Sequence, residues 1–210
     1  MDGTYRVAMA GRSVMGNWFK YWNYPGMLSR HANFLPWPIP YKRYAKGDSV
    51  FDYVRIVPPR PDSPSADYGR KTLDSLIRQV RGKQYDALFF KFCYIDFGDK
   101  RLKDENARED LFGKMTKLFG AVHAFAREER LKLLAGTALP VLKAGAHAQP
   151  LRLEYNAWLK GYAGKNGDVT VFDLFGYLTD ADGRLRPDLA RSSSDPHLNN
   201  RAYQLLEKEL

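Results

Sequence analysis

The chain has 210 residues, long enough for one domain with a full hydrophobic core, and its 44% apolar and 27% charged residues are typical of a globular protein. A formal net charge of +9 admits a nucleic acid, an acidic substrate or a membrane surface as partner. No contiguous basic run is present, so a solvated basic surface is the better interpretation and no nucleic-acid partner is expected. The single cysteine, Cys93, excludes an internal disulfide, and the four histidines lack metal-ligand spacing, so we expect neither a metal nor a cofactor.

No apolar stretch reaches the length of a membrane span, and residues 1–6 do not resemble a secretory signal. We therefore expect a single domain over residues 1–210 in the cytoplasm, or a secreted protein if the first methionine replaces a removed signal peptide. No feature of the sequence specifies an oligomeric state.

The first predicted element is a strand that ends in a tight turn. The apolar run 5–10 stops at Gly11, and Arg12 and Ser13 follow directly before residues 13–21, which can form a helix. Such a turn lifts a serine hydroxyl above the carboxyl end of a sheet and points helix N–H groups at the same place. Ser13 is therefore either an N-cap or a nucleophile whose oxyanion these N–H groups hold.

A proline-rich and aromatic segment follows, over residues 23–46. Its prolines exclude a continuous helix or a central strand, so we expect an irregular loop. The aromatic side chains either line a substrate pocket or pack onto the body of the protein to cover the sheet. Residues 49–57 alternate polar and apolar positions and end at Pro58, which predicts a strand near a sheet edge.

The rest of the chain alternates between helix and strand. Helical spacing of apolar residues continues in residues 71–82, 105–130, 151–163 and 197–209. Short apolar runs, typical of buried parallel strands, occupy residues 85–92, 131–135 and 169–172. The alternation predicts an α/β fold, a three-layer sandwich in which a parallel sheet of about five strands carries helices on both faces. The site of such a sheet lies at the carboxyl ends of its strands.

Two stretches at predicted strand ends match the first blocks of a known superfamily. Gly11-Arg12-Ser13 matches a Gly-Asp-Ser block at its glycine and serine, with Arg12 in place of the aspartate. Gly69, just before a predicted helix, fits a second block that consists of one glycine. On these stretches the chain resembles the SGNH hydrolases, also called GDSL-type esterases and lipases.

The third and fourth blocks of that superfamily are also recognisable. Cys93-Tyr94-Ile95-Asp96 aligns with Gly-x-Asn-Asp after the central strand and keeps only the final aspartate, so Ile95 stands where the asparagine is usual. Asp195-Pro196-His197 aligns with Asp-x-x-His before the last helix, with the aspartate two residues ahead of the histidine rather than three. The resemblance covers nearly the whole chain in element order and implies the flavodoxin-like SGNH hydrolase fold.

The resemblance also implies a reaction. Ser13 would attack an ester carbonyl, His197 would take its proton and return it to the leaving alcohol, and Asp195 would orient His197. This chemistry is that of a serine hydrolase of carboxylic esters, with O-acetyl esters of carbohydrates or small molecules as candidate substrates. The alternative is a catalytically impaired relative that binds a glycan or an anionic ligand, and a weaker third possibility is a nucleic-acid-binding protein.

The oxyanion hole implied by the resemblance uses the N–H groups of Ser13 and Gly69. The third donor is missing at Ile95, and loss of one such donor typically costs on the order of 10²–10³ in rate. Asn17 lies one helical turn after Ser13 and either replaces that donor or faces solvent.

Three further side chains are candidates for contact with the substrate. Arg12 places a cation beside the nucleophile and either favours an acidic substrate or forms a structural ion pair. Trp18 and Tyr94 are the aromatic candidates, while we expect Asp96 to cap or brace the loops of the site.

Overall fold

The computed structural model describes residues 3–23, 42–59, 63–64, 66–98, 102–193, 195 and 197–210. Its centre is a six-stranded sheet with the order β2-β3-β1-β4-β5-β6. Five strands are parallel: β1 (Tyr5–Gly11), β3 (Ser49–Arg55), β4 (Ala87–Phe90), β5 (Lys132–Gly136) and β6 (Val169–Phe172). The sixth strand, β2 (Arg43–Lys46), pairs antiparallel with β3 at the edge.

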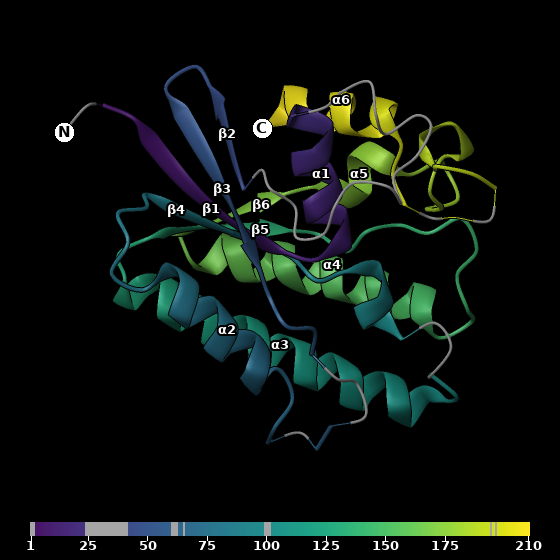
Figure 1. Cartoon of the computed structure of the whole chain (residues 1–210). Helices are drawn as coiled ribbons and strands as arrows, with labels where there is room; N and C mark the ends of the chain where they lie inside the picture. Colours follow the sequence, from purple (N-terminus) through teal and green to yellow (C-terminus); the bar gives the residue numbers. More distant parts are fainter. Residues whose placement is uncertain are drawn as a thin grey trace.

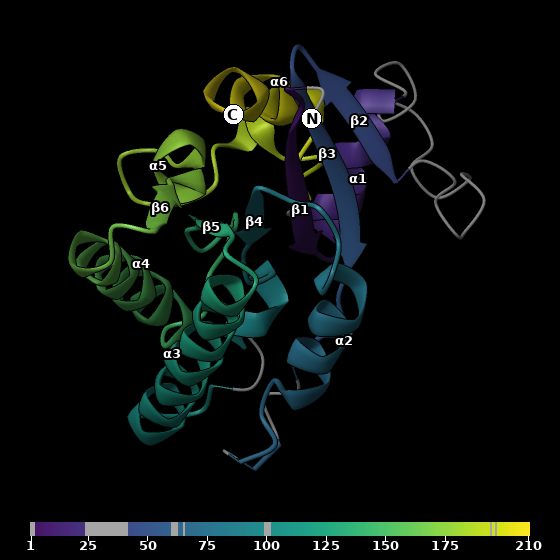
Figure 2. The same cartoon turned by 90° about the vertical axis from the view of Figure 1, so that its left-hand side faces the viewer.

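Helices cover both faces of this sheet (Figures 1 and 2). One face carries α1 (Ser13–Asn23), α5 (Leu174–Leu178) and α6 (Asn200–Glu209). The other face carries α2 (Arg70–Val80), α3 (Glu105–Glu128) and α4 (Ala148–Lys165). The predicted three-layer α/β sandwich is therefore confirmed, with five parallel strands and one antiparallel strand in addition.

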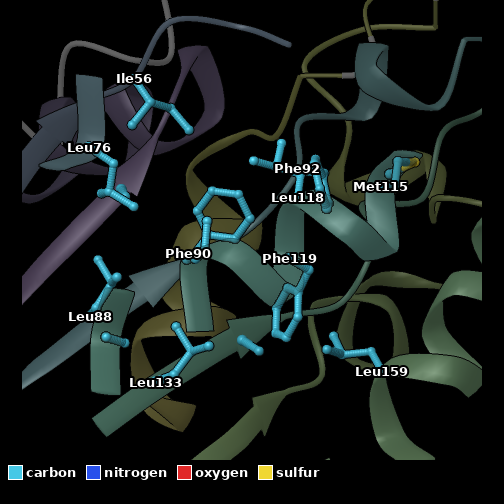
Figure 3. Close-up of a cluster of buried hydrophobic side chains, with 14 of the residues drawn as sticks. Ile56, Leu76, Leu88, Phe90, Phe92, Met115, Leu118, Phe119, Leu133 and Leu159 are labelled. Carbon is cyan, nitrogen blue, oxygen red and sulfur yellow. The ribbon is translucent and has the colours of Figure 1, made fainter. Parts of the chain in front are cut away.

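Strand β4 shows why a continuous apolar run becomes a central strand. Successive side chains of a strand point to opposite faces. Leu88 and Phe90 therefore enter the core under α3 and α4, whereas Ala87 and Phe89 enter the core under α1 and α6. Figure 3 shows Leu88 and Phe90 facing Phe119 of α3 within the first of these cores. Because both faces of β4 are covered, no polar alternation is needed in its sequence.

Parts of the fold differ from the expectation. Arg43–Lys46 forms an edge strand where we expected an irregular loop, because its backbone pairs with β3. The expected pocket or cover made by residues 24–41 lies outside the described residues. Three short helices among the described residues were not predicted: the 3₁₀ helix Tyr94–Phe97 follows β4, α5 follows β6, and a second 3₁₀ helix, Pro187–Leu189, precedes α6.

The parallel strands bring their carboxyl ends to one edge of the sheet, called here the carboxyl edge, and their amino ends to the amino edge. At the carboxyl edge, Gly11 is buried and a Cβ atom there would lie 2.7 Å from the Cβ of Met15, so only glycine lets α1 begin so close to β1. The backbone of β3 is fixed to the same turn, since the Ile56 N–H donates to the Gly11 carbonyl. Within the described residues, no helix is both long and apolar enough to cross a membrane.

Candidate active site

The serine turn presents an exposed hydroxyl. Helix α1 begins at Ser13, and the Gly16 N–H donates to the Arg12 carbonyl, so Ser13 occupies the first helical position rather than the cap. The residues on either side of the turn, Gly11 and Val14, are buried, whereas Ser13 is exposed. Its Oγ lies 3.9 Å from the Cys93 Sγ. The N-cap alternative for Ser13 is therefore wrong.

A histidine and an aspartate are paired in the loop before α6. The His197 Nδ1 lies 2.6 Å from the Asp195 Oδ1, and the His197 backbone N–H donates to the same oxygen. Burial opposes ionisation of Asp195, but these hydrogen bonds outweigh it and lower the pKa of Asp195. An ionised Asp195 accepts only, so Nδ1 must carry the proton and the lone pair is left on Nε2. Asp195 is therefore placed to orient His197, although it stands two residues before it.

Ser13 and His197 meet the same short segment from two sides. Cys93 contacts Ser13, and the Tyr94 hydroxyl lies 3.5 Å from the His197 Nε2. The rings of Tyr94 and His197 are edge-on, with centroids 5.3 Å apart and an interplanar angle of 87°. Within the described part of the chain no hydrogen bond joins Ser13 to His197. The tertiary structure thus brings the two residues to consecutive positions of one turn, with Nε2 directed to Tyr94.

That turn is held by Asp96. Its carboxylate accepts the Cys93 N–H at 2.7 Å, and its own N–H donates to the Cys93 carbonyl at 2.9 Å. Arg12 Nη1 lies 2.6 Å from the other carboxylate oxygen, so Asp96 ties the third sequence block to the serine turn as expected. Burial raises the pKa of Asp96, against the opposing effect of Arg12 and the Cys93 N–H. The ion-pair alternative for Arg12 is the one that the structure shows, because its guanidinium faces Asp96.

Two buried cations near this turn were not predicted. Lys91 is 2% exposed, and its Nζ donates to the Phe92 carbonyl at 3.4 Å. Burial lowers the pKa of Lys91. Arg152 of α4 is fully buried, donates to the Tyr94 carbonyl at 3.1 Å and lies over the Phe97 ring. The lysine inside the apolar run 85–92 could have indicated a buried cation from the sequence alone. Arg152 could not, because an arginine in a helix is usually exposed.

The predicted oxyanion donors Gly69 and Asn17 lie in different surroundings. Gly69 caps α2 with φ of 72°, and a Cβ there would lie 2.4 Å from the Leu118 side chain, which explains the glycine. Asn17 is 9% exposed, and its side chain hydrogen-bonds the buried Tyr203 of α6. The solvent-facing alternative for Asn17 is therefore wrong. Its contribution to the hole, like those of Ser13 and Gly69, stays a prediction.

The expected substrate contact of Trp18 is wrong. Trp18 is fully buried and packs against the rings of Phe89 and Tyr203, because it lies on the side of α1 that packs against the sheet. Ile95 instead is 48% exposed and lies in the 3₁₀ helix that Tyr94 begins. An apolar side chain is thus presented to solvent where the superfamily places asparagine.

A pocket of about 410 Å³ lies farther along the carboxyl edge, between the loop after β5 and the turn that contains Asp182 and Arg184. Lys143 and Gln149 also line it, but Ser13 and His197 do not. Across the described ranges, no group of three or more His, Cys, Asp or Glu side chains could hold a metal ion.

Comparison with known proteins supports the fold through structure alone. No protein-family model matches the sequence, and no curated protein is significantly similar to it. A GDSL-like lipase from Bacteroides thetaiotaomicron superimposes with a TM-score of 0.60 at 13% identity, over 98% of this chain and 89% of that one. A lipolytic protein of the G-D-S-L family from Veillonella parvula superimposes with a TM-score of 0.60 at 12% identity, over 98% of this chain and 96% of that one.

These similarities identify the class of fold. The chain has the α/β fold of the SGNH or GDSL-type hydrolases, so the expected fold is confirmed, whereas the match of the four sequence blocks stays a prediction. At 12–13% identity the residues of the site are not carried over by the comparison, and the chemistry rests on this chain's own geometry.

Proposed function

We propose that the protein is a serine hydrolase of carboxylic esters, with Ser13 as nucleophile, His197 as base and Asp195 as the group that orients the base. One observation carries the proposal: Cys93 and Tyr94, consecutive in the chain, contact Ser13 and His197 respectively, so the two residues lie around one turn. The hydrogen bond between Asp195 and His197 adds the orienting partner that a catalytic imidazole needs. The names of the similar structures, a GDSL-like lipase and a lipolytic protein, support ester chemistry.

The reaction follows from these positions. Nε2 carries the lone pair, so it takes the Ser13 proton as Oγ attacks the ester carbonyl. To do so, the His197 ring must turn from Tyr94 toward Ser13, and the distance of 3.5 Å to Tyr94 indicates a weak contact that can be exchanged. The backbone N–H groups at the start of α1 point to the same edge and are the first candidates to hold the oxyanion.

The proposed substrates are O-acetyl esters of carbohydrates or small molecules. Two features favour a neutral substrate over an acidic one. Ile95 offers an exposed apolar contact beside the turn, and the Arg12 guanidinium is already paired with Asp96, so an acidic substrate is not favoured at this position.

The test is labelling of the purified protein with a fluorophosphonate probe, together with hydrolysis of p-nitrophenyl acetate. Ser13→Ala is expected to abolish labelling and to lower kcat by about 10⁴-fold or more, because the nucleophile is lost. Ser49→Ala is the matched control, since Ser49 lies at the amino end of β3 on the opposite edge of the sheet. Labelling that persists in Ser13→Ala, or no labelling of the folded wild-type protein, would reject the assignment.

Binding without turnover is the second candidate. It is favoured by Ile95 in place of the asparagine donor and by the absence, among the described residues, of a hydrogen bond between Ser13 and His197. It predicts a wild-type protein that binds acetylated oligosaccharides in a calorimeter and hydrolyses neither these nor p-nitrophenyl acetate. Hydrolysis that depends on Ser13 would exclude it.

A further inference from the structure

The His197 Nε2 faces a hydroxyl group that has no place in the serine mechanism as stated above. In the neutral imidazole, which is the form that acts as base, Nδ1–H donates to Asp195 and Nε2 accepts, so the Tyr94 O–H is the donor in their 3.5 Å contact. The edge-on packing of the two rings holds the phenol beside this nitrogen. Tyr94 therefore lies on the side of His197 from which the base handles its proton.

The position of Tyr94 is fixed through its backbone. Its carbonyl accepts a hydrogen bond from the buried Arg152, and the turn that precedes it is closed by the hydrogen bonds between Cys93 and Asp96. The phenol also remains a donor at neutral pH, because burial and the neighbouring Cys93 and Asp195 raise the pKa of Tyr94. A neutral hydroxyl on a fixed backbone is a preorganised donor, since only the direction of its O–H bond has to change during a reaction.

We propose that Tyr94 is a further catalytic residue, whose hydroxyl donates a hydrogen bond to the leaving-group oxygen while His197 returns its proton to that oxygen. The inference rests on the proposed function. In this step the bond between the carbonyl carbon and the leaving oxygen breaks, and its electron pair goes to the oxygen. The proton comes from the His197 Nε2, and the Tyr94 O–H bond stays intact. The only change at Tyr94 is that its hydrogen bond moves from Nε2 to the leaving oxygen.

The proposal names a class of substrate. A nitrophenolate spreads its charge over a ring and leaves without assistance, whereas the oxygen of an alkyl or sugar alcohol concentrates the charge. Hydrogen bonds to charged groups contribute about 1.5–3 kcal/mol, or roughly 10- to 100-fold in rate. Tyr94 thus adapts the site to esters of aliphatic alcohols, of which sugar esters are one group.

The test compares Tyr94→Phe with the wild-type protein on ethyl acetate and on p-nitrophenyl acetate. The phenylalanine keeps the ring packed on His197 and removes only the hydroxyl. The ratio of kcat/KM for ethyl acetate to that for p-nitrophenyl acetate should fall by about tenfold or more. Tyr5→Phe is the matched control, because Tyr5 is 38% exposed at the amino end of β1, and it should leave the ratio unchanged.

An unchanged ratio overturns the proposal. If activity on both esters falls equally, Tyr94 only supports the structure, and if neither activity falls, its hydroxyl does not reach the leaving group. A second readout needs no activity: the ¹⁵N resonance of the neutral His197 Nε2 should move in Tyr94→Phe toward that of a free lone pair, and an unmoved resonance overturns the contact. A wild-type protein that hydrolyses neither ester refutes the proposed function as well, whereas Ser13-dependent hydrolysis with an unchanged ratio refutes the role of Tyr94 alone.

Discussion

Among the described residues, two networks of a tyrosine, a histidine and an aspartate lie at opposite edges of the sheet. At the carboxyl edge, His197 lies between the Asp195 carboxylate and the Tyr94 hydroxyl. At the amino edge, His123 of α3 lies 3.0 Å from Asp168, just before β6, and 2.7 Å from the Tyr162 hydroxyl of α4.

The two networks differ in the exposure of the histidine and in the length of its contact with the tyrosine. The His123 side chain is 3% exposed, and Asp168 is also held by Arg127 through contacts of 2.6 Å and 3.0 Å. The His197 side chain is 22% exposed. Its contact with Tyr94 is 3.5 Å long, 0.8 Å longer than the 2.7 Å contact between His123 and Tyr162.

The comparison shows that residue type alone does not distinguish the network at His123 from the one proposed to be catalytic at His197. Every ring nitrogen of His123 has a short partner from another element, so the network joins α3, α4 and β6 and leaves no lone pair for a substrate. His197 has only the weak 3.5 Å contact with the Tyr94 hydroxyl at Nε2, and in the proposed mechanism a substrate replaces it. The proposed catalytic role of His197 therefore rests on its one weakly held ring nitrogen, because both networks have the same three residue types.

The largest expected effect comes from alanine at the two histidines. His197→Ala should lower kcat on p-nitrophenyl acetate by about 10⁴-fold or more and change the free energy of unfolding by less than about 0.5 kcal/mol. His123→Ala should instead lower the free energy of unfolding by about 1–3 kcal/mol, since a buried side chain is truncated and its two partners lose their hydrogen bonds, with unchanged activity per folded molecule. Urea unfolding and ester hydrolysis check both; loss of activity without destabilisation in His123→Ala would break the comparison.

Asparagine at the two aspartates gives a smaller effect. Asp195→Asn should lower kcat by about 10²–10⁴-fold, because an amide no longer enforces the proton on Nδ1. Asp168→Asn should leave kcat unchanged and lower stability in a manner that depends on pH. Hydrogen bonds from Arg127 and His123 lower the pKa of Asp168, so its stabilising contribution is complete above about pH 4 and is lost as pH falls toward the lowered value.

Unfolding measured from pH 7 downward tests this sign. The stability difference between the wild-type protein and Asp168→Asn should stay constant to about pH 4 and shrink below it. A difference that grows on acidification would show that the carboxylate is not the stabilising form.

The smallest expected effect comes from the amino-edge tyrosine. Tyr162→Phe removes the hydroxyl partner of His123 and should lower the free energy of unfolding by about 0.5–1.5 kcal/mol. The preference between ethyl acetate and p-nitrophenyl acetate should stay at its wild-type value, in contrast to Tyr94→Phe. A change of that preference in Tyr162→Phe would show that the network at His123 also influences the reaction, and would contradict its purely structural role.

The sequence by itself determined the layers and the ends of the site. The apolar run at residues 85–92 predicted a buried parallel strand between amphipathic helices, and such a sheet has its site where the strands end. Residues 169–172 also form a parallel strand, but the expectation that it is central is wrong, because β6 lies at the edge of the sheet and only Val169 is buried. That reasoning put Ser13 after the first strand and the pair of Asp195 and His197 before the last helix. Asp195 and His197 are neighbours in the chain, so local geometry is enough to join them.

Only the tertiary structure decided which distant side chains meet. Arg12 and Asp96 are 84 residues apart, and Tyr94 and His197 are 103 apart, so no periodicity could pair them. Trp18 and Asn17 illustrate the same limit, since both lie just after the serine turn and the packing of α1 against the sheet and α6 directs them into the core. Helical spacing predicts which residues share a face, but the helix on the other side decides whether that face meets substrate or protein.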